Sequence, residues 1–243
     1  MNAIKQNLDA YTKENIYDFD NEIILHYYPK RIIEKLGGVD PVGEKSLLEL
    51  GLGHGYSALE FQKYFSRYRI IEGDKTVIDK FINGHGSFAI DIVHSLFEEY
   101  ESDEQFDVVV AGFVLEHVSD PVFVLEKTKK NVKKNGKLFV AVPNAASLNR
   151  RIGYEAGLLS DIMELSETDY ALGHKRYFIE ESIRSVCTSA GLQIESVEGI
   201  YLKPFTTSQI LSLKLDKDII EAFCRVGRDY PELCVGMLLE CTV

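Results

Sequence analysis

The chain has 243 residues, of which 45% are hydrophobic and 27% are charged, and its net charge is −11. This composition suits one globular domain, and no stretch approaches the roughly 18 apolar residues of a membrane-spanning helix, so we expect no membrane association. The acidic charge disfavours a nucleic-acid partner, whose binding face would be basic, and the polar N-terminus lacks the apolar run of a signal peptide, which indicates a cytoplasmic protein.

Residues 1–36 are expected to form helices. Asp20 is a candidate cap for a segment whose apolar residues recur at helical spacing, Pro29 is expected to break or kink it, and Gly37-Gly38 to end it. We interpret 1–36 as a helical lid that excludes water from the site, with ordinary helix packing as the alternative explanation for its tyrosines. These tyrosines are Tyr11, Tyr17, Tyr27 and Tyr28.

From residue 45 onward, short apolar strands alternate with helices. The strands are expected at 45–50, 68–72, 88–93, 106–111 and 137–142, and the helices at 57–64, 76–82 and 120–134, with a turn at Asn135-Gly136. The 106–111 segment, FDVVVA, is apolar throughout, as a strand buried on both faces should be. The alternation predicts a parallel sheet with helices on both faces.

The last third of the chain is expected to finish the same domain, which spans 1–243. Residues 143–178 lack strong periodicity and are interpreted as a cap inserted over the strand ends. A helix at 179–190, closed by Gly191, leads to strands at 193–200 and 234–241, with a helical excursion at 206–227 between them. No crossover follows the last strand, which favours antiparallel pairing. The four cysteines form no CxxC pair and are expected to be reduced core residues.

The sharpest motif is LLELGLGHG, in which a buried strand runs into Gly51, Gly53 and Gly55 and then into a helix. Glycine permits positive φ and close approach of a ligand, and ligands of open parallel sheets bind beyond the carboxyl ends of the strands. Glu72 ends the second strand 21 residues after Gly51 and can accept hydrogen bonds from ribose hydroxyls. Asp74 could share that role or cap the next helix.

The spacing of the turn is GxGxG rather than the GxGxxG of dinucleotide folds, and no Lys or Arg follows it to meet a phosphate. Glu49 precedes the first glycine instead. A carboxylate there would repel a pyrophosphate and attract an ammonium or sulfonium group. His54, inside the turn, is expected to point away from the ligand.

Four segments resemble motifs of the class I S-adenosylmethionine (SAM)-dependent methyltransferases over about 45–200: LLELGLGHG followed by IEGD, FDVVVAGFVLEHVSDP, VPNAASLNRR and GHKRYF. The LEHV-x-DP run is frequent in small-molecule members. The resemblance implies a doubly wound α/β fold, a seven-stranded, mostly parallel sheet of order 3-2-1-4-5-7-6 with the last strand antiparallel. It also implies SAM as the cofactor, and an acidic protein suits this cationic ligand.

The resemblance further implies where the cofactor lies. Its methionine and ribose parts are assigned to Glu49, Gly51, Gly53, Gly55 and Glu72, with Asp74 beside them. The adenine pocket is placed near His94, Ser95 and Leu96, although many members carry an Asp where His94 stands. Gly112 and Phe113, directly after the fourth strand, complete the expected set.

Methyl transfer needs a base only if the acceptor starts protonated. His117, which follows Glu116, could take a proton from a hydroxyl, with a helix cap or pocket wall as the alternative. His174 and Tyr177 are further catalytic candidates, or else part of a turn that anchors the cap. The segment that ends in Glu116-His117 resembles the ExxEH metal motif of ubiquinone-pathway O-methyltransferases. Phe113 occupies the position of its first carboxylate, so we expect no metal.

The acceptor is expected to contact the lid, the end of the fifth strand and the cap. The candidates are Tyr17, Tyr28, Asn144, Arg151 and Arg176. Arg176 could bind an acceptor carboxylate or phosphate through two hydrogen bonds, and Arg150-Arg151 could instead be a solvated pair.

The sequence therefore predicts an enzyme that transfers a methyl group from SAM to an O or N atom of a small molecule, such as a sugar, a nucleotide sugar or another biosynthetic intermediate. A nicotinamide-dependent oxidoreductase and a non-catalytic SAM-binding protein are the alternatives. A homodimer is left open.

Overall fold

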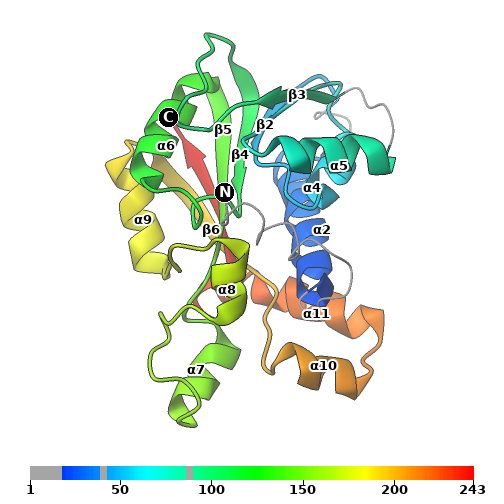
Figure 1. Cartoon of the computed structure of the whole chain (residues 1–243), viewed down its shortest axis with the longest axis vertical. Coiled ribbons are helices and arrows are strands. Elements are labelled where there is room, and N and C mark those ends of the chain that lie inside the picture. Colours follow the sequence, from blue (N-terminus) through cyan, green and yellow to red (C-terminus); the bar gives the residue numbers. More distant parts are fainter. Residues whose placement is uncertain (1–17, 39–42, 86–89) are drawn as a thin grey trace.

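Seven strands form one sheet in the order β3-β2-β1-β4-β5-β7-β6 (Figure 1). The structure is a computed structural model, and it describes residues 18–38, 43–85 and 90–243. The strands are β1 (Ser46–Leu50), β2 (Arg67–Glu72), β3 (Ile90–His94), β4 (Phe106–Gly112), β5 (Val132–Pro143), β6 (Gln193–Ile200) and β7 (Gly236–Thr242). The pairs among β1 to β5 are parallel, whereas β7 runs antiparallel to both β5 and β6. The predicted strand order and reversed last strand are confirmed.

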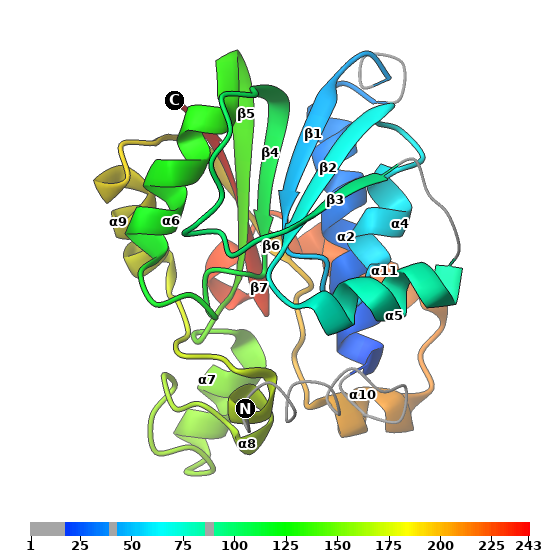
Figure 2. The same cartoon turned by 45° about the horizontal axis from the view of Figure 1, so that its top comes forward.

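Helices cover both faces of the sheet (Figure 2). One face packs against α6 (Pro121–Thr128) and α9 (Glu180–Ser189). The other packs against α2 (Asp18–Lys35), α4 (Tyr56–Phe61), α5 (Lys75–His85) and α11 (Lys217–Gly227). Val108 and Val110 of β4 face the second group of helices and Val109 and Ala111 the first, all fully buried, which is why this strand is apolar throughout.

The cap and the α10 segment lie beyond the carboxyl ends of the parallel strands. The cap contains α7 (Leu148–Glu155) and α8 (Glu167–Leu172), and α10 (Thr207–Leu213) lies across from it (Figures 1 and 2). Two 3₁₀ turns, Lys129–Asn131 and Pro231–Leu233, complete the described elements. None of the helices in the described ranges has the length and apolarity needed to span a membrane. The four cysteines are buried and free, as predicted.

Helix α2 differs from its prediction at both its start and its middle. It begins at Asp18 and continues through Pro29, so the expected cap at Asp20 is wrong; of the break or kink expected at Pro29, the break is wrong and the kink stays a prediction. A proline inside a helix costs about 3 kcal/mol, and here the buried side chains around it, Tyr28, Ile32 and Ile33, offset that cost. The end at Gly37-Gly38 is confirmed, since both residues have positive φ. The proposed lid role of residues 1–17 lies outside the described residues.

Helix α6 is shorter and strand β5 is longer than predicted, so the connection between them lies earlier in the chain. Helix α6 ends at Thr128 rather than near 134, and β5 already begins at Val132. The expected turn at Asn135-Gly136 therefore falls inside β5, where the pairing with β4 shifts register. A side chain at Gly136 would approach the Asp107 carbonyl oxygen to 3.0 Å, so glycine allows this close passage.

Candidate functional site

The glycine turn follows β1 and has a backbone that only glycine adopts readily. Gly51, Gly53 and Gly55 have φ values of +83°, +49° and +79°. A Cβ at Gly51 would lie 2.7 Å from Val114 Cγ1, and one at Gly55 would lie 2.6 Å from the Phe81 ring. A Cβ at Gly53 would meet no atom within 4 Å. The turn is therefore packed from behind at two glycines and open at the third.

Glu72 joins the tips of β1 and β2. One carboxylate oxygen accepts a hydrogen bond from the Leu52 backbone N–H and the other from that of Asp74, both at 2.8 Å. Each oxygen retains a lone pair, so the group can hold the turn and still accept from ribose hydroxyls. Asp74 accepts a bond of 2.7 Å from the Thr76 N–H at the start of α5, which is the capping role left open by the sequence.

Glu49 is sealed behind the turn, with 1% of its surface exposed. The Tyr68 hydroxyl donates to one of its oxygens, and the Tyr28 hydroxyl lies 3.5 Å from the other. Burial raises the pKa of Glu49 to about 7, because hydrogen bonds from Ser57 and the two tyrosines only partly offset the loss of water. Glu49 does not line the cavity beside the turn, so its expected direct contact with a sulfonium is not what this geometry supports.

The segment after β3, the expected adenine pocket, packs against the tip of β2. Ser95 N–H donates to the Glu72 carbonyl at 3.0 Å, and His94 Nε2 lies 3.1 Å from the Gly73 carbonyl oxygen. Leu96 is 51% exposed and therefore offers an open apolar surface next to Glu72. The adenine assignment of these residues stays a prediction.

A cavity of about 190 Å³, here called the glycine cavity, lies beside the turn. The expected residues among those lining it are Gly51, Gly53, Gly55, Gly112, Phe113, Tyr28, His117 and His174. Phe113 has a positive φ of 54°, and a Cβ at Gly112 would lie 2.5 Å from the Tyr28 hydroxyl. His54 also lines this cavity, and its expected orientation away from the ligand stays a prediction. It stacks on Tyr56, with ring centroids 5.9 Å apart.

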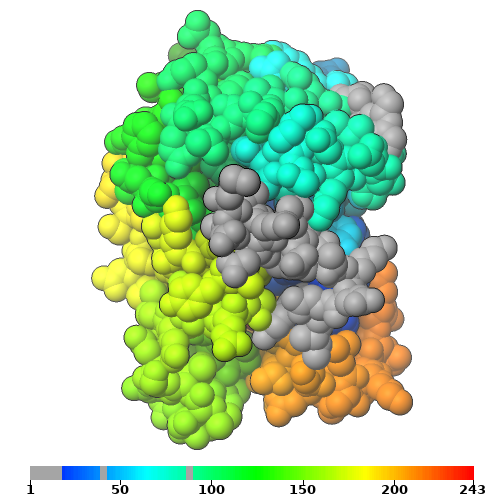
Figure 3. All heavy atoms as spheres, viewed as in Figure 1, coloured from blue at the N-terminus to red at the C-terminus, as the bar shows by residue number. Residues whose placement is uncertain are grey.

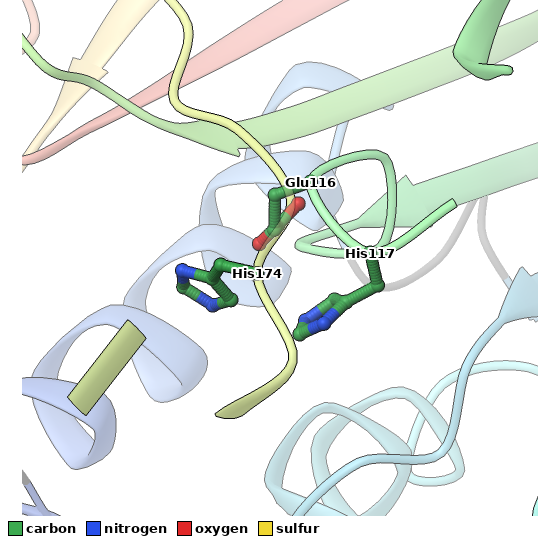
Figure 4. A group of neighbouring side chains, drawn as sticks. All are labelled: Glu116, His117 and His174. Carbon is green, nitrogen blue, oxygen red and sulfur yellow. The ribbon is translucent and has the colours of Figure 1, made fainter. Parts of the chain in front are cut away.

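Glu116, His117 and His174 form a cluster in the wall of the glycine cavity (Figure 4). The rings of His117 and His174 meet edge to face, with centroids 4.8 Å apart, and the Glu116 carboxylate points toward the space between them. Glu116 is 1% exposed, and its Oε2 has no hydrogen-bond partner within the described ranges. The Lys175 N–H donates to the Glu116 carbonyl at 2.8 Å, which fixes the cap against this loop.

The pKa values of the cluster move in opposite directions. Burial raises the pKa of Glu116 to about 7, whereas burial and the positive charge of His174 lower that of His117 to about 4. Burial would also lower the pKa of His174, but contact with Asp169 and the negative charge of Glu116 outweigh it and raise the pKa. At neutral pH, His117 is therefore neutral, and His174 is the more basic of the two histidines.

Asp169 is a site residue that sequence reasoning missed. Its Oδ1 lies 3.0 Å from His174 Nδ1, an ion-pair distance without the alignment of a hydrogen bond. Its Oδ2 accepts hydrogen bonds from the Ser166 N–H (2.7 Å), the Ser166 hydroxyl (2.5 Å) and the Tyr177 hydroxyl (2.8 Å). The available signal was an acid five residues before His174, with Gly173 between them to end α8.

The donor atoms of Glu116, His117 and His174 lie within 4.8 Å of one another. Atoms that ligate one ion at about 2.1 Å lie roughly 3–4 Å apart, so this cluster is wider than a metal centre as it stands. The predicted lack of a metal remains a prediction.

A second cavity of about 470 Å³, here called the cap cavity, lies between α2, the cap and α10. The cap and the α10 segment are side by side at the lower end of the face in Figure 3. Six residues line both cavities: Asn21, Ile24, Pro143, Leu172, His174 and Val235. The two cavities therefore adjoin, and His174 lies at their junction.

The cap cavity contains a buried ion pair that the sequence did not reveal. Lys203 Nζ and the Thr207 hydroxyl both donate to Asp20 Oδ2, although Asp20 and Lys203 are 183 residues apart in sequence. Asp20 and Lys203 are 8% and 6% exposed. This pair connects α2 to the segment that follows β6.

The expected acceptor residues are only partly brought together. Asn144 and Tyr177 line the cap cavity, but the Asn144 amide donates to the carbonyls of residues 231, 232 and 234. Arg151 bonds the Ala146 and Glu232 carbonyls and Arg176 the Ser119 carbonyl, and neither lines either cavity. Arg150, which does line the cap cavity, lies over the Tyr177 ring at 4.5 Å. Tyr17 lies outside the described residues.

Comparisons with known proteins agree on one family. Residues 22–197 match the family model described as a methyltransferase domain. The human mitochondrial ubiquinone biosynthesis O-methyltransferase is 29% identical over 108 residues, or 44% of this chain and 28% of that protein. The Aeromonas salmonicida ubiquinone biosynthesis O-methyltransferase is 28% identical over 133 residues, 53% of each chain. The matched region therefore spans about half or less of the length of these relatives.

Solved structures share the fold at low identity. A SAM-dependent methyltransferase from Mesorhizobium loti superposes with a TM-score of 0.60 at 14% identity, covering 89% of this chain and 99% of that one. The N-methyltransferase NodS from Bradyrhizobium japonicum, in complex with S-adenosylhomocysteine, gives 0.55 at 13% identity, covering 94% and 88%.

Proposed function

The chain belongs to the class I SAM-dependent methyltransferases, and we propose that it transfers the methyl group of SAM to an O or N atom of a small-molecule acceptor. The proposed acceptor is a sugar or another biosynthetic intermediate. The observation that carries this proposal is the pair of adjoining cavities, one beside the glycine turn and one beneath the cap, with His174 at their junction.

The residues of the glycine cavity fit SAM. The open side of Gly53 leaves bare backbone for the cofactor, and the Glu72 carboxylate, which lies next to the cavity rather than in its lining, keeps lone pairs for a ribose that extends beyond it. Glu116 lines the cavity with an oxygen that has no hydrogen-bond partner among the described residues, and a cation bound beside it would favour the ionised form of its carboxyl group. When bound, SAM supplies an activated methyl group on a sulfonium, and the protein supplies orientation and electrostatics.

The cap cavity is the proposed site of the acceptor. Most of the residues around it carry hydroxyl, amide or charged side chains, and apolar atoms form the larger part of its surface, so it suits a molecule with both polar and apolar parts. An acceptor bound there would reach the glycine cavity across the residues that the two cavities share. In-line transfer requires such a meeting, because the acceptor atom must approach the methyl carbon opposite the sulfur.

Two measurements test this proposal. Calorimetry with SAM and with NAD, in separate titrations, should give binding of SAM alone. Incubation of the protein and isotope-labelled SAM with metabolite extracts should then give a labelled methylated product by mass spectrometry. Preferential binding of NAD would favour an oxidoreductase, and SAM binding without any transfer would favour a non-catalytic SAM-binding protein.

A further inference from the structure

We propose that His174, positioned by Asp169, is the general base that takes the proton from an acceptor hydroxyl, which makes this protein an O-methyltransferase. The inference rests on the proposed function, since it assigns the chemistry of the same site. It depends on the contacts of Asp169, on the place of His174 between the two cavities and on the contrast with His117.

Asp169 is held in one position by hydrogen bonds to one of its two carboxylate oxygens. Three donors, the Ser166 N–H, the Ser166 hydroxyl and the Tyr177 hydroxyl, all bind Oδ2. The other oxygen, Oδ1, is left to face His174 Nδ1 at 3.0 Å. These contacts hold the pKa of Asp169 well below its usual range despite burial, so the carboxylate stays ionised beside the ring.

An ionised carboxylate beside Nδ1 determines which ring nitrogen can act as a base. The negative charge of Asp169 favours the neutral imidazole that carries its proton on Nδ1, the nitrogen facing the acid, which leaves the lone pair on Nε2. The His174 side chain is 12% exposed and lines both cavities, so a ligand in either can reach the ring. Asp169 is thus a positioning residue, and His174 is the catalytic one.

The neighbouring His117 is a weaker candidate for the base. Its pKa of about 4 means that it binds a proton poorly at neutral pH, whereas that of His174 is raised above its ordinary value. The charged and titratable groups around His174 are Asp169 from α8, Glu116 and His117 from the loop after β4, and Tyr177, with Arg150 stacked on it. The two carboxylates favour the protonated form of His174, and His117 is neutral.

A dedicated base favours oxygen over nitrogen as the atom that is methylated. A neutral amine has a free lone pair and can lose its extra proton to water after the transfer. An aliphatic hydroxyl is a poor nucleophile near neutral pH unless a base removes its proton as the new bond forms. The dyad of Asp169 and His174 supplies such a base at the junction where an acceptor would meet the methyl group.

The step balances with the groups named. The hydroxyl proton passes to His174 Nε2, and the acceptor oxygen forms a bond to the methyl carbon. The carbon–sulfur bond breaks, and its electron pair stays on sulfur, so the sulfonium charge disappears. The positive charge passes to the imidazolium, which Asp169 stabilises until the proton is lost to water.

The first test needs no acceptor. In the full chain, the imidazole signals of His174, assigned with a His174→Gln variant, are titrated by NMR. We expect a midpoint above 6.5 that falls in Asp169→Asn, because the negative charge that stabilises the imidazolium is lost. Ser166→Ala removes one donor to Asp169 but keeps the carboxylate, and is expected to leave the midpoint in place. An unchanged midpoint in Asp169→Asn would overturn the dyad.

The second test identifies the product and the step. Transfer from SAM labelled with ¹³C in its methyl group into metabolite extracts should give an O-methyl signal rather than an N-methyl one. His174→Gln should lower the transfer rate about 100-fold, with a much smaller change in the Kd for SAM by calorimetry. An N-methyl product, or a His174→Gln variant with the unsubstituted rate, would overturn the inference. Failure of the unsubstituted protein to bind SAM would instead contradict the proposed function.

Discussion

The two cavities of the site are built in different ways. The turn beside the glycine cavity is held by the tips of neighbouring strands through contacts within about one βαβ unit, such as that of Leu52 with Glu72, and residues of α2 and the cap only complete the lining. The cap cavity is assembled from α2, the cap and α10, and its buried ion pair joins residues 183 positions apart. A cofactor common to a family can be held by backbone geometry, whereas an acceptor requires side chains collected from distant segments.

This contrast separates the effects of substitutions. Changes beside the glycine turn should act on SAM binding, and changes in the cap cavity should act on stability and on the acceptor.

The largest effect is expected in the cap cavity. Lys203→Ala removes one partner of the buried pair and leaves the Asp20 carboxylate without its counter-charge. We expect a loss of about 3–5 kcal/mol in the free energy of unfolding, measured with urea, and an unchanged Kd for SAM in the folded protein. The double variant Lys203→Met with Asp20→Asn should recover much of the loss, because no charge is then left buried. Unchanged stability in Lys203→Ala would show that the pair contributes little.

The second effect belongs to the glycine cavity. Glu72→Ala removes the carboxylate that holds the Leu52 and Asp74 N–H groups and is expected to weaken SAM binding by about 30- to 100-fold, the equivalent of about 2–3 kcal/mol. Calorimetry measures the change. Asp74→Ala is the matched control, since Asp74 caps α5, and it should change the Kd only slightly. A larger loss in Asp74→Ala than in Glu72→Ala would move the ribose contact to Asp74.

The same contrast explains what the sequence could predict. The glycine turn and Glu72 were predictable because a strand, a turn and an acid at the tip of the next strand follow one another along the chain. Asp169 and Lys203 were not, because no local pattern marks a residue whose partner approaches only after folding. The break expected at Pro29 was wrong for a related reason: the burial of the surrounding side chains outweighs the local preference of proline.

A smaller effect is expected from Glu49, which lies in the core behind the glycine turn. Its pKa in the folded protein, about 7, is above the ordinary value of 4.5, so its contribution to stability is complete below pH 4.5 and is lost as the pH rises through 7. As the pH rises from 5 to 8, the free energy of unfolding should therefore fall by about 2 kcal/mol less in Glu49→Gln than in the unsubstituted protein. Urea unfolding of both proteins at these pH values measures this difference.

Other groups determine the control for this measurement. The pKa of Glu116 is also raised by burial. Its contribution to the fall of the free energy of unfolding with pH should therefore be present in both the unsubstituted protein and Glu49→Gln. The pKa values of Asp107 and Glu198 are lowered to about 2, so their stabilisation is lost only below about pH 4. Parallel curves for the two proteins between pH 5 and 8 would mean that Glu49 is not protonated on folding.

The smallest effect should come from Gly53, and it tests where the cofactor lies. Alanine at Gly51 would strain a positive φ and also clash with Val114, whereas alanine at Gly53 strains φ but enters open space. Gly53→Ala should therefore cost only about 1 kcal/mol of stability, and Gly51→Ala clearly more. Gly53 itself lines the glycine cavity, so a methyl group on it should weaken SAM binding about 5- to 10-fold, or about 1 kcal/mol. If SAM binds Gly53→Ala as tightly as the unsubstituted protein, the cofactor does not occupy the space beside Gly53, and the cavity assigned to it belongs to something else.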